Sequence, residues 1–262
     1  MHLILPTTVQ LEITDNCNFR CQHCYRLEDC ERHFKDSDDE RVMDIARHLV
    51  KDKVYNVILT GGEPMTRPKL LMRLVEYLCE NDFNVNINTN LTLLTDDLLD
   101  CFIKNDVRNL LVSCPSGIPE EYNMITRTSA FNVFEKNLRK LSESGLHHSI
   151  NMVVNKLNAT SVRKTAEFVK SCGSVRFGAT PMSLNALYPR KDLLLTNNGV
   201  RSLLYELYGV HKDLGMEIDV MEALPKCAIP EEFVREGLCF TRRKCQAGLT
   251  TAAISCKGDV RP

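Results

Sequence analysis

The sequence lacks an excess of charge, a targeting segment and any run suited to crossing a membrane. Its 262 residues include 33 basic and 34 acidic side chains, so a net charge of −1 offers no overall field for nucleic acid or an anionic membrane. The opening segment MHLILPTTVQ has no basic leader, and Pro6 ends its short apolar run, which is unlike a signal peptide or a transmembrane helix. Long internal repeats and low-complexity tracts are also absent. These absences predict a cytoplasmic globular protein with neither nucleic-acid nor membrane partners.

Cysteine, by contrast, is plentiful. The chain has 12 cysteines, and without an export signal they predict thiols in a reducing compartment, binding metal or buried, rather than a disulfide scaffold. A hydrophobic fraction of 44% over this length is sufficient for a large core. The placement of the thiols therefore decides what kind of site the chain carries.

Short apolar runs rich in β-formers alternate with longer segments of helical spacing. Predicted strands cover residues 9–14, 56–60, 84–90, 109–114, 149–154 and 174–180, and predicted helices cover about 38–51, 69–81, 96–105, 130–145, 161–173 and 198–214. Six such β-α units with right-handed crossovers predict an α/β fold with a parallel sheet, open or curled into a partial (β/α)6 barrel. A full TIM barrel would need eight units.

The pattern changes from about Met216, where short strands, prolines and cysteines replace the β-α alternation. We therefore predict two parts: a core over residues 1–215, and a second, smaller module over 216–262.

Two unusual motifs follow the first two predicted strands. The segment TDNCNFRCQHCYR (Thr14 to Arg26, the cysteine loop) follows the first strand, and Gly61-Gly62-Glu63-Pro64 follows the second. Functional residues in parallel α/β sheets belong at the carboxyl ends of the strands. Both motifs are therefore expected on one rim of the sheet.

The cysteine loop carries three thiols spaced C-x3-C-x2-C, with no fourth at matching spacing: Cys17, Cys21 and Cys24. A disulfide would close a very short ring and leave one thiol over. A structural zinc site needs four ligands, and His23, Cys30 or His33 could supply the fourth. In a [4Fe–4S] cluster, three thiolates would leave one iron open to an exogenous molecule. Iron–sulfur and zinc remain alternatives on the residues alone.

At this point the sequence resembles a known family. CNFRCQHCY resembles the cluster loop of radical S-adenosylmethionine (SAM) enzymes, and GGEP after the second strand resembles their SAM-binding turn. The resemblance covers residues from about Val9 to Leu214. It implies a [4Fe–4S] cluster on the three loop cysteines, an open iron that binds the SAM methionine, and reductive cleavage of SAM to a 5′-deoxyadenosyl radical.

The same resemblance implies contacts to SAM. Tyr25 would lie near the adenine, and the backbone of Gly61, Gly62 and Glu63 would meet the SAM ammonium. Strand-end positions that would face the ribose or carboxylate are Asn88, Asn90 and Ser113, with Asn151 and Val153 as weaker candidates. Each has a plainer alternative, such as a packing aromatic, a strand-to-helix turn or a satisfied strand-end polar group. Cys114 and Pro115 in VSCPSG depart from the acidic pattern of relatives.

The segment CQAGLTTAAISCKGDVRP resembles the opening of the SPASM or twitch module, which carries an auxiliary Fe–S cluster in radical SAM maturases. Cys239 and Cys245 are the candidate ligands of such a cluster, Cys227 is a weaker one, and Cys256 lies off the pattern. The sequence stops at Pro262, where the next ligand cysteine would follow. We therefore expect an incomplete module.

The resulting hypothesis is a radical SAM enzyme that modifies a peptide or protein side chain, as maturases of ribosomal peptides and sulfatases do. A flavodoxin or ferredoxin would be its reductant, and no general acid or base is named by the sequence. One alternative is a radical SAM enzyme of tetrapyrrole or haem side-chain modification. Another, of a different class, is a zinc-stabilised binding protein.

Overall fold

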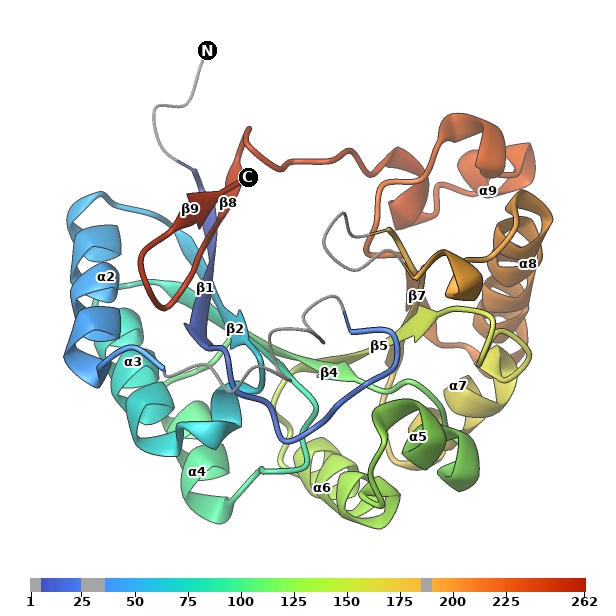
Figure 1. Ribbon diagram of the computed structural model, residues 1–262. Helices are drawn as coiled ribbons and strands as arrows, with labels where there is room; N and C mark the ends of the chain where they lie inside the picture. Colours follow the sequence, from blue (N-terminus) through green and yellow to red (C-terminus); the bar gives the residue numbers. More distant parts are fainter. Residues whose placement is uncertain (1–5, 25–35, 185–189) are drawn as a thin grey trace.

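The computed structural model describes residues 6–24, 36–184 and 190–262 and shows one curved sheet with helices outside it (Figure 1). The strands are β1 (Thr8–Thr14), β2 (Asn56–Gly61), β3 (Asn84–Thr89), β4 (Asn109–Ser113), β5 (His148–Val154), β6 (Arg176–Pro181), β7 (Glu217–Asp219), β8 (Thr251–Ile254) and β9 (Val260–Arg261). Their order in the sheet is β7-β6-β5-β4-β3-β2-β1-β8-β9, with every neighbouring pair parallel except β8 and β9.

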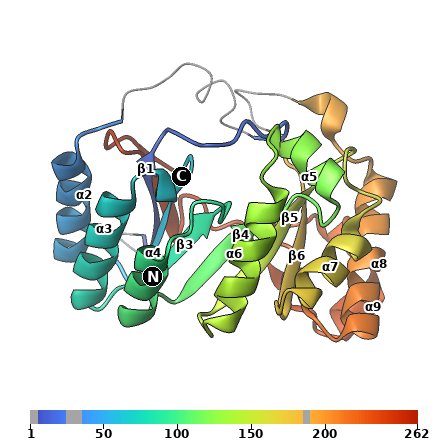
Figure 2. The same ribbon diagram turned by 90° about the horizontal axis from the view of Figure 1, so that it is seen from below.

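The helices cover the outer face of this sheet, as the second view shows (Figure 2). They are α2 (Asp39–Lys51), α3 (Pro68–Glu80), α4 (Asp96–Lys104), α5 (Pro119–Thr126), α6 (Phe131–Glu143), α7 (Val162–Ser171), α8 (Asn197–Leu214) and α9 (Glu231–Arg235). The six predicted β-α units are therefore confirmed, and the fold is an α/β partial barrel. Within the described ranges, no helix combines the length and the apolar character needed to cross a bilayer.

Helices α5 and α9 were not predicted, and α5 is the one beside the site. Helix α5 occupies the stretch that was expected to be an irregular loop between β4 and α6. Its start carries recognisable signals, because Pro119 stands in the first turn and Glu120 and Glu121 follow it. Its eight residues are too few to show a helical period in the sequence. This short helix turns out to support the cysteine loop.

The two faces of the sheet differ in polarity because alternate strand residues point to opposite sides. In β3, Val85 and Ile87 are buried in the core under the helices, whereas Asn86 and Asn88 are only half-buried. In β1, Leu11 and Ile13 join the same core, while Gln10 is exposed. The inner face therefore carries polar side chains, which suits a polar ligand better than a second apolar layer.

The residues from 216 onward add to both edges of this sheet. Strand β7 pairs with β6, and β8 pairs with β1 in a register that aligns Thr8 with Thr251 and Leu11 with Ile254. Strand β9 then turns back antiparallel along β8. The segment predicted as a smaller module thus supplies the strands that flank the six-stranded core on either side.

Candidate functional site

The cysteine loop leaves the carboxyl end of β1 and is held from one side by helix α5. The three cysteines of the loop are half-buried. The backbone N–H of Gln22 donates to the carbonyl of Ile125 at 2.9 Å, and that of Arg20 donates to the carbonyl of Thr126 at 3.3 Å. These two bonds bracket Cys21. The unpredicted helix α5 therefore fixes the middle of the loop by its last carbonyl groups, which have no partner within the helix.

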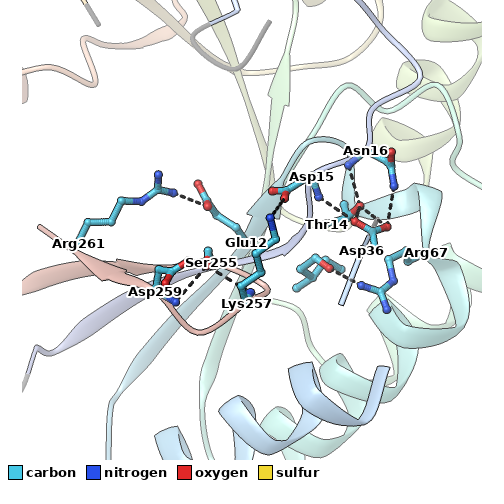
Figure 3. Close-up of polar contacts among 11 residues, drawn as sticks. Glu12, Thr14, Asp15, Asn16, Asp36, Arg67, Ser255, Lys257, Asp259 and Arg261 are labelled. Carbon is cyan, nitrogen blue, oxygen red and sulfur yellow. Dashed lines mark hydrogen bonds and ion pairs between the residues drawn. The ribbon is translucent and has the colours of Figure 1, made fainter. Parts of the chain in front are cut away.

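The root of the loop, residues 14–16, is held by a single carboxylate. Asp36 accepts from Thr14 Oγ1 at 2.9 Å, from the Asp15 N–H at 3.0 Å and from Asn16 Nδ2 at 2.9 Å (Figure 3). Hydrogen bonds to an ionised acceptor are stronger than neutral ones. The direction in which the chain enters the cysteine loop is thus set by a residue that no motif had indicated.

The Gly-Gly-Glu turn packs directly against this root. The Gly62 N–H donates to the Thr14 carbonyl at 2.8 Å, and the Glu63 N–H donates to the Asn16 carbonyl at 2.8 Å. A Cβ on Gly61 would lie 2.3 Å from the Thr14 oxygen, and one on Gly62 would lie 2.0 Å from the Asn16 oxygen. In the expected contact of this turn with the SAM ammonium, glycine allows the backbone to approach a ligand closely. The structure gives them a second role, since only glycine lets the two motifs touch.

The side chain of Glu63 points into the protein. Its Oε1 accepts from the Met65 N–H at 3.1 Å and from Thr89 Oγ1 at 2.8 Å, and its Oε2 accepts from the Asn90 N–H at 2.7 Å. Burial raises the pKa of Glu63 to about 7, and the three hydrogen bonds limit that rise. The carboxyl group therefore fastens the turn after β2 to the end of β3.

This raised pKa predicts a pH-dependent stability. A carboxyl whose pKa is higher in the folded chain contributes its full stability below pH 4.5 and loses it as the pH rises through about 7. Each pKa unit corresponds to 1.36 kcal/mol, so the free energy of unfolding should fall by about 3 kcal/mol over this window relative to a Glu63→Gln variant. Urea unfolding of both proteins between pH 4.5 and pH 8 measures the difference. Glu120→Gln, at an exposed glutamate, is the control, and parallel curves for wild type and Glu63→Gln would contradict the prediction.

Asn90 connects the end of β3 to the cysteine loop. Its Nδ2 donates to Asn18 Oδ1 at 2.8 Å, and its Oδ1 accepts from Thr92 Oγ1 at 2.7 Å. Asn18 Nδ2 in turn donates to Thr92 Oγ1 at 2.9 Å. The described hydrogen bonds of Asn90 are thus made within the protein, as is expected of a strand-end polar residue with a structural role.

The other predicted SAM contacts occupy the strand ends in different ways. Asn88 is half-buried on β3, and Ser113 is exposed at the end of β4. Asn151 on β5 accepts a hydrogen bond from Thr180 Oγ1 at 2.8 Å, and Val153 is half-buried. Tyr25 lies outside the described residues. By strand alternation Asn88, Ser113, Asn151 and Val153 all lie on the inner face. Their contacts with SAM stay predictions, as does that of Asn90.

The surroundings of the loop fit a soft, electron-rich group such as an iron–sulfur cluster. The Phe19 N–H donates to the Cys17 sulfur at 3.4 Å, a contact that stabilises a thiolate. Among the described residues, the buried Nδ1 of His23 and hydroxyl of Tyr122 have no hydrogen-bond partner. The Tyr122 ring packs edge-on against Phe19, with centroids 6.3 Å apart. Buried polar atoms of this kind call for an explanation, and a group bound beside the loop would supply one.

Within the described ranges, no three His, Cys, Asp or Glu side chains are arranged to hold a single metal ion. In a [4Fe–4S] cluster each cysteine binds a different iron, so its thiolates need not converge as zinc ligands do.

The remaining cysteines that the structure describes fall into two groups, while Cys30 and His33 lie outside the described residues. Cys101, Cys114, Cys172 and Cys256 are buried, and Cys79 is half-buried. The exposed ones are Cys227, Cys239 and Cys245. Cys239 lines a cavity of about 220 Å³ on the inner side of β4 to β7, together with Arg176, Glu217 and Asp219. The two candidate auxiliary ligands, Cys239 and Cys245, thus belong to the exposed group.

Comparisons with known proteins agree with this architecture. A family model described as the Radical SAM superfamily matches residues 11–169, more than half of the chain. The AdoMet-dependent heme synthase of Methanosarcina barkeri is 29% identical over 178 residues, which cover 66% of this chain and 49% of that protein. The antilisterial bacteriocin subtilosin biosynthesis protein AlbA of Bacillus subtilis is 24% identical over 266 residues, covering 98% of this chain and 55% of that protein.

Solved structures show the same fold. Streptococcus suis SuiB bound to S-adenosylmethionine superimposes with a TM-score of 0.81 at 18% identity, covering all of this chain and 61% of that one. The chain spans about half the length of the curated relatives it matches. The similarity therefore extends over the partial barrel and its flanking strands.

Proposed function

Because the chain belongs to the radical SAM superfamily, we propose that it cleaves S-adenosylmethionine reductively at a [4Fe–4S] cluster and thereby modifies a peptide or protein side chain. The observation that carries this proposal is the joining of the two motifs. The cysteine loop and the Gly-Gly-Glu turn meet at the carboxyl ends of β1 and β2 through two backbone hydrogen bonds of 2.8 Å each. A cluster on the loop would therefore lie beside a turn suited to the methionine part of SAM.

The residues of the chain have distinct parts in this proposal. Cys17, Cys21 and Cys24 would hold the cluster, which when bound supplies the electron for cleavage of the SAM sulfonium. Asp36 and helix α5 fix the loop that carries the thiols. The buried aromatic ring of Tyr122, under Phe19, keeps water from one side of the loop.

On the SAM side, the backbone of Gly61 to Glu63 would meet the amino group, while the Glu63 carboxyl keeps the turn in place from behind. Asn88, Asn90 and Ser113 would face the ribose or carboxylate, with Asn151 and Val153 as weaker candidates. Tyr25 remains the candidate neighbour of the adenine.

The relatives support a peptide substrate. AlbA is by its name a bacteriocin biosynthesis protein, and SuiB has a structure bound to its precursor peptide SuiA, which superimposes with a TM-score of 0.80. The heme synthase relative, at 29% identity, supports tetrapyrrole modification as a second candidate. Membership of the superfamily argues against the zinc-stabilised binding protein, which does not explain the Gly-Gly-Glu turn.

Three further features belong to the proposal. Cys239 and Cys245 would be ligands of an auxiliary Fe–S cluster, within a module that begins near Met216. A flavodoxin or ferredoxin would supply electrons. The cytoplasm would be the compartment, in keeping with the twelve cysteines of the chain.

The test is SAM cleavage under anaerobic conditions. Protein reconstituted with iron and sulfide is expected to release 5′-deoxyadenosine from SAM only when dithionite is present, as measured by chromatography. Addition of a precursor peptide or of a porphyrin then separates the two substrate classes by which one increases the rate. Absence of 5′-deoxyadenosine from protein that holds an intact cluster and receives both substrates would overturn the proposal.

A further inference from the structure

The hairpin formed by β8 and β9 places two cations against the strand that carries the cysteine loop. Strand β8 lies beside β1, and the turn over residues 255–259 reaches the carboxyl end of β1 (Figures 1 and 3). Ser255 shapes this turn by accepting from the Asp259 N–H at 3.1 Å. Arg261 on β9 and Lys257 in the turn are the two cations, and both pair with carboxylates of β1 or the residue after it.

Arg261 pairs with a carboxylate that is almost completely buried. The guanidinium forms an ion pair with Glu12, whose side chain is only 5% exposed (Figure 3). Glu12 stands opposite Thr60 in the β1–β2 register. Thr60 directly precedes the Gly-Gly-Glu turn, so Glu12 lies in the wall immediately below that turn. A buried carboxylate is strongly destabilising when its cationic partner is removed.

Lys257 pairs with the root of the cysteine loop. Its Nζ lies 3.7 Å from Asp15 Oδ2, and the Asp15 side chain is 9% exposed. The Lys257 carbonyl accepts a hydrogen bond from Arg41 on α2, so the turn is held between β1 and that helix. The Asp15 N–H is one of the groups that Asp36 binds. The hairpin, Asp36 and α2 therefore converge two residues before Cys17.

From these contacts we infer that the β8–β9 hairpin is a positioning element of the site, in which Arg261 fixes the wall below the Gly-Gly-Glu turn and Lys257 fixes the root of the cysteine loop. The link to SAM chemistry rests on the proposed function, whereas the positioning itself is a property of the folded chain. If the hairpin only covered the edge of β1, its cations would not need to match buried carboxylates.

Variants of the Arg261–Glu12 pair distinguish a positioning role from simple coverage of the β1 edge. Arg261→Met keeps most of the side-chain volume but removes the cation from Glu12. Glu12→Gln in the same chain removes the carboxylate that needs it, so the double variant is expected to recover what the single variant loses. Arg242→Met is the matched control, because Arg242 is an exposed arginine in the same C-terminal region.

Hydrogen–deuterium exchange of residues 10–18 and 58–64 in the protein without cluster is the first readout. Arg261→Met is expected to speed exchange there about tenfold, and the double variant to return to within about twofold of wild type. Lys257→Met, whose cation is 46% exposed, is expected to change exchange only about twofold, in residues 10–18 alone. Exchange in Arg261→Met equal to that in Arg242→Met, or no recovery in the double variant, would overturn the inference.

Binding of SAM to the reconstituted protein is the second readout. The dissociation constant of SAM should rise in Arg261→Met and recover in the double variant, while the control stays at the wild-type value. A wild-type protein that neither binds nor cleaves SAM would refute the proposed function and leave the exchange result to decide the inference alone. If Arg261→Met does not fold, the double variant Glu12→Gln/Arg261→Met is still expected to fold. A double variant that does not fold would contradict a role for the pair.

Discussion

Alanine at Gly62 is expected to separate the two motifs of the site and to abolish SAM cleavage. A Cβ at this position would lie 2.0 Å from the Asn16 carbonyl oxygen and 3.0 Å from that of Asp15. Both atoms belong to the backbone, which cannot rotate away as a side chain can. Overpacking a well-packed site typically costs about 1–3 kcal/mol and occasionally more, and a backbone contact this short belongs at the upper end.

Variants at two other glycines separate the effect of a steric contact from that of backbone strain. Gly61 combines a φ of +130° with a Cβ position 2.3 Å from the Thr14 oxygen, so Gly61→Ala is expected to cost at least as much as Gly62→Ala. Gly145 has a φ of +74° and no heavy atom within 4 Å of its Cβ position, so Gly145→Ala carries only backbone strain of about 1–3 kcal/mol. Urea unfolding gives the three free energies. Gly62→Ala as stable as wild type would contradict the close packing of turn and loop.

Single alanine variants at the three loop cysteines are expected to lose the cluster altogether. The loop has only three cysteines for four irons, so removing any one leaves too few thiolates. Each of Cys17→Ala, Cys21→Ala and Cys24→Ala should release no more 5′-deoxyadenosine from SAM than a sample without protein. Iron and sulfide per chain, together with the electron paramagnetic resonance spectrum of the reduced protein, give the cluster content directly.

The matched control is Cys101→Ala, because Cys101 is buried on α4. It should keep both iron and SAM cleavage at the wild-type level. A loop variant that keeps a SAM-cleaving cluster would contradict the assignment of that cysteine. Purified wild-type protein that holds zinc in place of iron after reconstitution would instead support the zinc-binding alternative.

The regular part of the fold could be predicted because its signal is local. Apolar runs such as NVILT specify a buried parallel strand, and the structure places β2 at Asn56–Gly61. The start of α4 is a local signal too, because Thr95 directly precedes the helix and its side chain accepts from the Leu98 N–H at 3.3 Å. Helix α5 could not be predicted in the same way, because only eight residues carry its pattern and its packing depends on distant partners.

The site shows the same division between local and distant information. Placing both motifs on one rim required only that parallel strands end together. The sequence does not say that the Glu63 carboxyl would turn inward to Thr89 and Asn90, 26 and 27 residues away. Nor does it show that Asp36 would accept three groups from the root of the loop, since no spacing rule joins a carboxylate to a backbone N–H that is 21 positions away in the sequence.

The pairing of β8 with β1 has a consequence for the order in which the chain folds. Thr7 and Thr250 share a hydrogen bond across 243 residues of sequence. During synthesis, β1 therefore emerges early and keeps one edge uncovered until β8 leaves the ribosome, and contacts of such separation are slow to form. The Arg261–Glu12 ion pair likewise forms only after Arg261 has been synthesised. This wall of the site therefore forms only after β8 and β9 have been synthesised, so cluster assembly should favour chains that already include residues 251–261 over shorter nascent ones.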